Sequence, residues 1–94
     1  FFYFFDAMEQ AAVELGLSQD DAKKLVRQTA YGSLKLSESS SEEFTQLIGQ
    51  VSSKGGTTER ALEIFDRKDF KRIIKEAIKA AQERSVEISK ETGK

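Results

Sequence analysis

The sequence contains no cysteine, no histidine, no proline and no tryptophan. Without cysteine the chain has no disulfide, no thiol nucleophile and no thiolate zinc site. Without histidine it lacks the usual general base and the commonest metal ligand, so a Ser-His-Asp triad is excluded. Any chemistry must therefore rely on hydroxyls, backbone amides, a bound cofactor or a second domain.

An excess of charge of one sign is also missing, and so is a long apolar run. The 94 residues carry a formal net charge of −1 with both signs interspersed, which gives no electrostatic footprint for nucleic acid. No apolar run approaches the roughly 20 residues that a membrane-spanning helix needs. Charged residues make up 33% of the chain and apolar residues 38%, a mixture typical of a soluble, helix-rich domain. We therefore expect residues 1–94 to form one undivided domain that binds neither nucleic acid nor membranes.

Helical periodicity dominates what is present. Apolar residues recur at three- and four-residue spacing over residues 1–15, 18–37, 42–50 and 58–66, and again over about twenty residues from position 70. No segment shows sustained alternation of apolar and polar residues, so no sheet is predicted. The sequence therefore predicts an all-α bundle of about five helices whose apolar faces pack inward.

Glycine and short polar residues mark the predicted helix ends. Gly16 suits the position just after the first helix, and Ser18 suits the cap that starts the second. Ser40 with Glu43 three residues later is typical of a capping box. Asp69 can cap the last helix.

The first five residues are all aromatic. At an exposed chain end, such a run would be a sticky apolar patch. We interpret it as the interior of a helix in a longer protein, or as a surface covered by a tightly bound second copy, and the two interpretations are compatible.

The stretch VSSKGGTT, residues 51–58, is the candidate site. In its simplest interpretation Gly55-Gly56 forms a turn with positive φ, and Thr57 or Thr58 caps the next helix. The same geometry brings backbone amides close to a small anion, with neighbouring hydroxyls as further donors. A phosphate-binding P-loop needs Lys and Ser/Thr after its last glycine, whereas Lys54 precedes the glycines, so a small carboxylate fits better than a nucleoside triphosphate. From the residues alone, a turn and an anion site both stay open.

The longer run V-S-S-K-G-G-T-T-E-R-A-L-E-I-F-D, residues 51–66, resembles the signature of Δ1-pyrroline-5-carboxylate reductases. The resemblance covers nearly the whole chain without a gap. Its other matching segments are Phe4-Phe5-Asp6-Ala7-Met8, Gly16-Leu17 followed by Ala22, Gln28-Thr29 with Gly32, and Glu83-Arg84-Ser85.

The resemblance implies that residues 1–94 are the C-terminal dimerisation and substrate-binding domain of a 6-phosphogluconate-dehydrogenase-like reductase. In that family an N-terminal Rossmann domain binds NADP or NAD. No G-x-G-x-x-G occurs in this chain, so we expect that domain to be missing from it and the chain alone to be inactive. The implied protein is a cytoplasmic enzyme of proline biosynthesis that reduces Δ1-pyrroline-5-carboxylate to L-proline. It would form an interlocked homodimer, which some members assemble into a decamer.

Site residues follow from the resemblance by position. The substrate-binding group would be Ser53, Gly55, Gly56, Thr57 and Thr58, and the amides of the last three would face the substrate carboxylate. The Thr58 hydroxyl would be catalytic, lying near the ring nitrogen to polarise or protonate the imine. Hydride transfer to a C=N bond needs orientation and charge placement more than a strong base, so a site without histidine is chemically consistent. No metal and no cofactor contact is expected in this chain.

Three departures from the family pattern affect the loops, one of which is that Ser39 to Phe44 lacks the family's usual His-Pro. Lys54 stands where the family usually has proline, which releases a fixed φ and adds a charge that we expect to point into solvent. Lys68-Asp69 stands where members often have two glycines. Two alternatives stay open: a helical dimerisation module without chemistry, and a related reductase acting on another imine or on a 2-oxo acid. The intact Ser-Gly-Thr stretch favours the pyrroline-5-carboxylate reductase over both, because a scaffold requires no such cluster.

Overall fold

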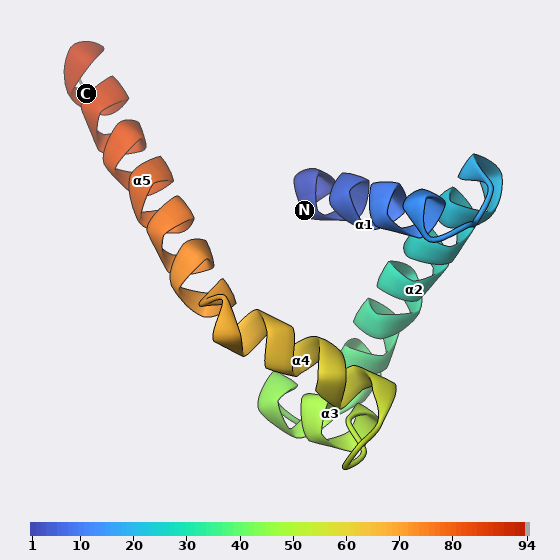
Figure 1. Cartoon of the computed structure of the whole chain (residues 1–94). Coiled ribbons are helices and arrows are strands. Elements are labelled where there is room, and N and C mark those ends of the chain that lie inside the picture. Colours follow the sequence, from blue (N-terminus) through green and yellow to red (C-terminus); the bar gives the residue numbers. More distant parts are fainter. Residues whose placement is uncertain (94) are drawn as a thin grey trace. The chain divides into compact units, whose positions relative to one another are not determined.

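The computed structural model describes residues 1–93, and every regular element in that range is an α-helix. The helices, labelled in Figure 1, are α1 (Phe2–Glu14), α2 (Gln19–Ser39), α3 (Phe44–Val51), α4 (Thr57–Arg67) and α5 (Phe70–Glu91). The predicted all-α class and the number of helices are confirmed, and the predicted ends lie within a few residues of the observed ones. Over the described range, no helix combines the length and the apolar character that crossing a membrane requires.

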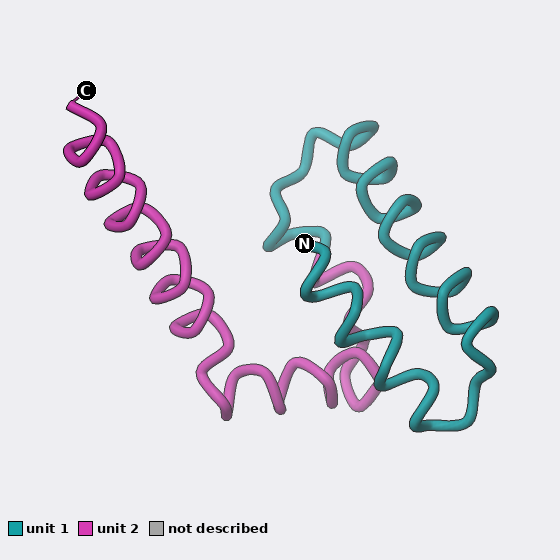
Figure 2. The backbone as a smooth tube through the Cα atoms, turned by 90° about the horizontal axis from the view of Figure 1, so that it is seen from above, with its two compact units in different colours: residues 1–47 teal, residues 48–94 magenta. Residues whose placement is uncertain are grey.

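The chain divides into two compact units, Phe1–Leu47 and Ile48–Lys94, shown in two colours in Figure 2. The boundary falls inside α3, which is a continuous helix, and no proline or polar linker marks it in the sequence. The first unit contains α1 and α2, and the second contains α4 and α5. Periodicity alone did not indicate this division.

In the first unit, α1 ends in a turn that hydrogen-bonds its last carbonyl groups. Gly16 has φ of 114°, and its N–H donates to the Val13 carbonyl oxygen at 3.0 Å, while the Leu17 N–H donates to that of Ala12 at 3.1 Å. This pair of bonds is a Schellman motif, which requires left-handed geometry and therefore favours glycine. The Ser18 hydroxyl then accepts the backbone N–H three residues later at 3.1 Å and starts α2. Both predicted helix ends are confirmed.

The small core of the described residues lies on α2, in the unit where α2 packs against α1. Ala22 and Val26 are the residues of the described chain that are buried, at 0% and 4% exposure. On the edge of this contact, the Arg27 guanidinium lies 4.0 Å from the Glu9 carboxylate. Two small apolar residues form a minimal core, so the two helices of this unit bury only a small part of their apolar faces.

The start of α3 differs from the predicted capping box. The Glu43 N–H donates to the Gln46 side-chain oxygen at 2.8 Å, while the Ser40 hydroxyl accepts the Glu42 N–H at 3.1 Å. The helix consequently begins at Phe44. The predicted pairing of Ser40 with Glu43 is wrong because Glu43 and Gln46 have the same three-residue spacing and form the capping interaction instead.

In the second unit, α4 and α5 meet at a sharp turn. Asp69 occupies the N-cap position of α5 in the left-handed conformation, with φ of 57° and ψ of 43°, and its side chain makes no capping hydrogen bond. The prediction that Asp69 starts the last helix is confirmed in position, but the expected side-chain cap is absent because a capping side chain needs an extended backbone. The rings of Phe65 and Phe70 lie on either side of the turn, with centroids 4.8 Å apart.

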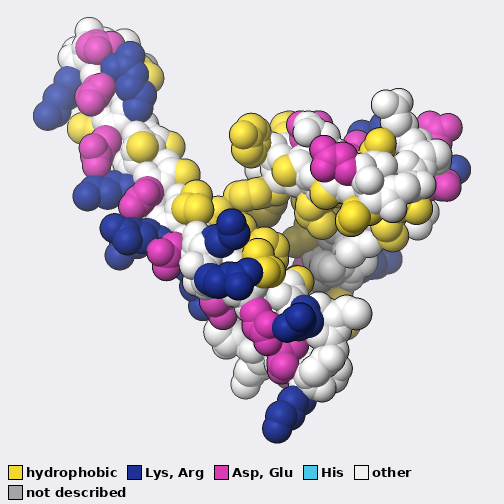
Figure 3. All heavy atoms as spheres, in the orientation of Figure 1, with side chains coloured by type: hydrophobic (Ala, Val, Ile, Leu, Met, Phe, Trp, Pro, Cys, Tyr) yellow, Lys and Arg dark blue, Asp and Glu magenta, His cyan; other side chains and the backbone are white. Residues whose placement is uncertain are grey.

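The apolar faces that we expected to pack inward are exposed over most of their area. When two helices pack together, each covers only the side of the other that faces it, and the remaining apolar residues stay exposed. Figure 3 shows hydrophobic side chains at the surface of both units. The expectation that these faces are buried is therefore wrong for a single chain, although the all-α class with five helices is confirmed. The exposed large apolar side chains include Phe2, Leu25, Leu34, Phe44, Ile48, Phe65, Ile73 and Ile88.

Candidate functional site

The candidate site is the loop between α3 and α4 together with the first turn of α4. The Gly56 N–H donates to the Ser53 carbonyl oxygen at 2.9 Å, which closes a tight turn over residues 53–56. Within this turn Gly55 has φ of 74°, a conformation that L-residues rarely adopt. Lys54 is exposed, in agreement with the expectation that it points into solvent. The sequence thus predicted the turn and its positive φ correctly.

Gly56 is required for a different reason than Gly55. Its φ of −84° and ψ of 176° are accessible to any residue. However, a Cβ at this position would lie 2.5 Å from the Ser53 hydroxyl oxygen and 3.1 Å from the Ser53 carbonyl oxygen. The absence of a side chain therefore allows the Ser53 hydroxyl to lie directly against the start of α4.

The first turn of α4 has backbone amides available to a ligand. Gly56 is the N-cap, and the first intrahelical bond runs from the Arg60 N–H to the Gly56 carbonyl oxygen at 3.2 Å. Among the described residues, the N–H groups of Thr57, Thr58 and Glu59 have no hydrogen-bond acceptor. Such amides carry the partial positive charge of a helix N-terminus and favour an anion.

Neither threonine caps the helix, because the extended N-cap position belongs to Gly56, which has no side chain. The prediction of a Thr57 or Thr58 cap is therefore wrong. Without a capping role, the hydroxyls are available for other partners, and Thr58 is half-buried whereas Thr57 is exposed. Of the three amides expected to face a carboxylate, that of Gly56 is engaged in the turn, and those of Thr57 and Thr58 are available.

Sequence reasoning missed one residue of this loop. The Glu59 carboxylate reaches back from α4 and accepts the Gly55 N–H at 2.9 Å. Glu59 lies three residues after the N-cap Gly56, which is the spacing of a capping box, so this spacing could have identified it. Here the carboxylate binds the amide one residue before the N-cap, because the Gly56 amide already donates to Ser53.

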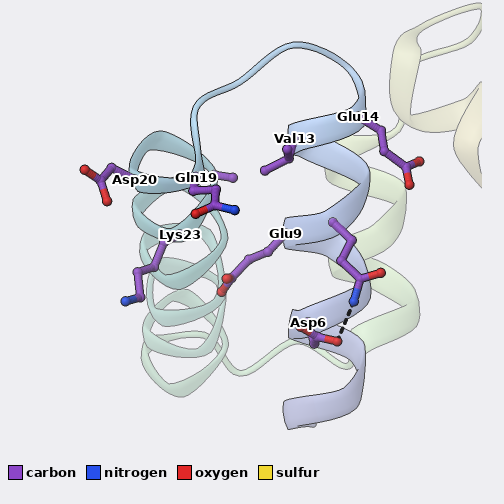
Figure 4. A pocket seen from close by; sticks show the side chains of 9 residues that line it. Asp6, Glu9, Val13, Glu14, Gln19, Asp20 and Lys23 are labelled. Carbon is purple, nitrogen blue, oxygen red and sulfur yellow. Dashed lines mark hydrogen bonds between the residues drawn. The ribbon is translucent and has the colours of Figure 1, made fainter.

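A groove of about 450 Å³ lies elsewhere, between α1 and α2 of the first unit, and contains none of the predicted site residues. In Figure 4 Glu9 extends from α1 toward α2, and Asp6 accepts a hydrogen bond of 2.7 Å from Gln10. The lining includes four carboxylates and one lysine, so its charge disfavours an anionic substrate. In residues 1–93 no group of His, Cys, Asp or Glu is arranged to hold a metal ion. The carboxylates of the groove are Asp6, Glu9, Glu14 and Asp20.

The helices and the loop together define an all-α chain with a helix start that is open to an anion. Residues 1–88 match the sequence model of a protein family described as "Pyrroline-5-carboxylate reductase dimerisation". The chain belongs to this dimerisation-domain family of the pyrroline-5-carboxylate reductases.

Individual relatives agree with the family match. The chain is 38% identical over 93 residues to the pyrroline-5-carboxylate reductase of Pseudomonas aeruginosa, covering 99% of this chain and 34% of the relative. It is 36% identical over 91 residues to that of Pasteurella multocida, covering 96% and 33%. The chain therefore spans about a third of the length of these relatives.

Solved structures agree as well. A crystal structure of Plasmodium falciparum pyrroline carboxylate reductase with NADP bound superposes with a TM-score of 0.87 at 33% identity, covering 89% of this chain and 32% of that one. A pyrroline-5-carboxylate reductase from Coxiella burnetii gives a TM-score of 0.86 at 31% identity, covering 92% and 32%. The family resemblance inferred from the loop sequence is confirmed over nearly the whole chain.

Proposed function

We propose that this chain is the substrate-binding and dimerisation domain of an enzyme that reduces Δ1-pyrroline-5-carboxylate to L-proline. Two observations support the proposal: the family match over residues 1–88, and the available amides of Thr57 and Thr58 behind a glycine turn. The second observation carries the functional argument, because it provides a site for a small carboxylate in a chain without histidine or cysteine.

The residues of this chain do not fit a nicotinamide dinucleotide. The described residues contain no strand, and the sequence contains no G-x-G-x-x-G, so the usual strand–turn–helix site for a dinucleotide is lacking. We therefore assign binding of NADP or NAD to a part of the protein outside residues 1–94. When bound, the cofactor supplies the hydride that reduces the C=N bond.

The role of this chain is to bind and orient the substrate. The amides of Thr57 and Thr58 bind the substrate carboxylate, and the Ser53 hydroxyl, held against Gly56, adds a donor beside them. The half-buried Thr58 hydroxyl donates a hydrogen bond to the ring nitrogen as hydride adds to the ring carbon, and the nitrogen gains its proton from solvent, directly or through this hydroxyl. Orientation and placed dipoles suit this reaction, because no strong base is needed to remove a proton from carbon.

We further propose that the protein acts as a homodimer in the cytoplasm, with a decamer as the higher assembly that the family resemblance allows. The exposed apolar faces of both units support self-association, because monomeric soluble proteins rarely expose contiguous apolar patches larger than a few hundred Å². The family match is to a dimerisation domain.

The test is oxidation of NADPH and of NADH by the full-length protein in the presence of Δ1-pyrroline-5-carboxylate. For Thr58→Ala we expect kcat to fall about 10- to 100-fold, because a donor to the reacting nitrogen is removed. Thr58→Ser keeps a hydroxyl at the same position and should recover most of the lost rate.

A matched control is Thr92→Ala, which removes a hydroxyl that donates only to the Ser89 carbonyl oxygen at the end of α5. Its kcat should equal that of the wild type. Absence of turnover with either cofactor would contradict the proposed reaction and favour one of the alternatives. Reduction of a different imine or of a 2-oxo acid would identify the related reductase, and no reduction at all would leave a dimerisation module.

A further inference from the structure

The proposed substrate loop, the turn over residues 53–56, is closed by the Gly56 N–H donating to the Ser53 carbonyl oxygen, but no side chain within it restrains the backbone angles. Two of its residues are glycines, which lose more conformational freedom on ordering than any other residue. The chain has no proline, so no φ angle in the loop is set by a ring, and exposed Lys54 precedes the two glycines. A contact from a residue outside the turn must therefore hold it in place.

Glu59 provides such a contact. Its carboxylate accepts the Gly55 N–H at 2.9 Å, at the residue whose φ is 74°. Glu59 lies in the first turn of α4, so its backbone is already fixed by the helix. The bond links the least restrained residue of the loop to the most regular element beside it, and a charged acceptor strengthens it.

The position of this carboxylate leaves the proposed anion site open. Glu59 binds the Gly55 amide, and the Gly56 amide donates to the Ser53 carbonyl oxygen at 2.9 Å. The amides of Thr57 and Thr58, which donate to no described acceptor, are the ones assigned to the substrate. An ordinary capping glutamate would bind the N-cap amide. Here the carboxylate fixes the turn that precedes it.

We propose that Glu59 is a positioning residue for the substrate loop: its bond to the Gly55 amide holds the 53–56 turn in the conformation that presents the Thr57 and Thr58 amides. It replaces in function the restraint that a proline at position 54 would supply. This inference rests on the proposed function, because it assigns the loop to the substrate. If the loop adopts its binding conformation in only a fraction of the molecules, the apparent Kd for the ligand equals the intrinsic Kd divided by that fraction.

The inference predicts a change in KM with little change in kcat. In Glu59→Ala the turn loses its restraint, so we expect KM for Δ1-pyrroline-5-carboxylate to rise about tenfold, since a single hydrogen bond to a charged group is lost. Once substrate is bound, the loop is in its productive conformation, so kcat should stay within about twofold. Glu59→Gln retains an acceptor oxygen without the charge, so its KM should lie between those of the wild type and Glu59→Ala.

A second substitution tests the restraint itself. Lys54→Pro fixes φ at position 54, so in the Glu59→Ala background it should return KM most of the way to the wild-type value. Hydrogen exchange of the peptide covering residues 53–60 gives a measurement independent of turnover: exchange should be faster in Glu59→Ala and slower again in the double variant.

The matched control is Glu63→Ala on the same helix. Glu63 is exposed and forms an ion pair with Arg60 at 3.4 Å, so its loss changes the net charge equally without touching the loop. Its KM should be unchanged.

An active protein in which Glu59→Ala leaves KM and exchange unchanged, or in which Lys54→Pro gives no recovery, would overturn the positioning role and leave the proposed function intact. An inactive wild-type protein would instead contradict the proposed function, while the exchange measurement would still decide whether Glu59 restrains the loop.

Discussion

Two adjacent glycines in the loop between α3 and α4 serve different physical purposes. Gly55 adopts φ of 74° with no atom within 4 Å of a hypothetical Cβ, so its constraint comes from the backbone. Gly56 has an ordinary backbone conformation, but a Cβ would lie 2.5 Å from the Ser53 hydroxyl oxygen, so its constraint comes from a neighbour. A pattern of two glycines predicts the turn, but only the structure separates the two reasons.

That difference predicts a coupling between Gly56 and Ser53. Gly56→Ala should lower the free energy of unfolding by about 1–3 kcal/mol, because the methyl group overpacks the turn. In a Ser53→Ala background the hydroxyl is absent, so the same substitution should cost clearly less, with the remaining cost due to the Ser53 carbonyl oxygen at 3.1 Å. Denaturant unfolding of the four proteins completes the cycle. An equal cost in both backgrounds would show that the hydroxyl does not contact position 56.

At the scale of helices, the sequence predicted ends that depend on local chemistry. Gly16 and Ser18 act as expected, because a left-handed residue after a helix and a hydroxyl before one depend only on nearby backbone. Where two residues compete for a local role, pattern reasoning failed. Glu43 pairs with Gln46 instead of with Ser40, and Gly56 takes the cap position expected of a threonine.

Burial could not be predicted from helical periodicity for one chain. The spacing identified the apolar faces of the helices correctly, but it does not say which surface covers them. Phe44 on α3 and Ile73 on α5 remain 69% and 56% exposed. The candidate loop was identified from its residues, and its substrate role from the family resemblance. Glu59 was missed although it has the three-residue spacing of a capping box, because that spacing does not show which backbone amide the carboxylate binds.

The junction of α4 and α5 gives a prediction about Asp69. Its left-handed conformation costs an L-residue roughly 1 kcal/mol, which glycine avoids, and its side chain forms no cap. Asp69→Gly should therefore raise the free energy of unfolding by up to about 1 kcal/mol. Asp69→Ala should lower it by a similar amount, since alanine adopts the left-handed conformation less readily than aspartate does.

The control for Asp69 is Asp20→Gly in the first turn of α2, where the backbone is helical and glycine should destabilise by about 0.5–1 kcal/mol. Thermal unfolding of the three variants and the wild type measures the differences. Stabilisation by alanine at position 69, or destabilisation by glycine there, would show that the left-handed conformation is not a cost.

At the scale of the whole molecule, the most informative feature is the shortage of buried residues. Ala22 and Val26 are the buried side chains in residues 1–93, which is too little to offset the conformational entropy of an ordered chain of this length. Helix α5 illustrates this shortage of burial, because hydrophobic side chains are exposed between charged ones along its surface in Figure 3. A second copy of the chain is the partner that a dimerisation domain implies.

Self-association is therefore expected to depend on the apolar face of α5. Ile73→Glu places a charge on this face, where burial in a dimer would be costly, and it should shift the full-length protein from dimer to monomer in sedimentation at micromolar concentration. Glutamate is a good helix former, and near the N-terminus of α5 its charge suits the helix dipole, so the helix itself should persist.

Lys79→Gln changes the net charge by the same amount on a charged face of α5 and should leave the dimer intact. A wild-type protein that sediments as a monomer would contradict dimerisation altogether, whereas an Ile73→Glu variant that remains dimeric would place the interface on other helices. In the expected case, unfolding of the wild type also becomes concentration-dependent, because the apolar faces are covered only when two chains meet.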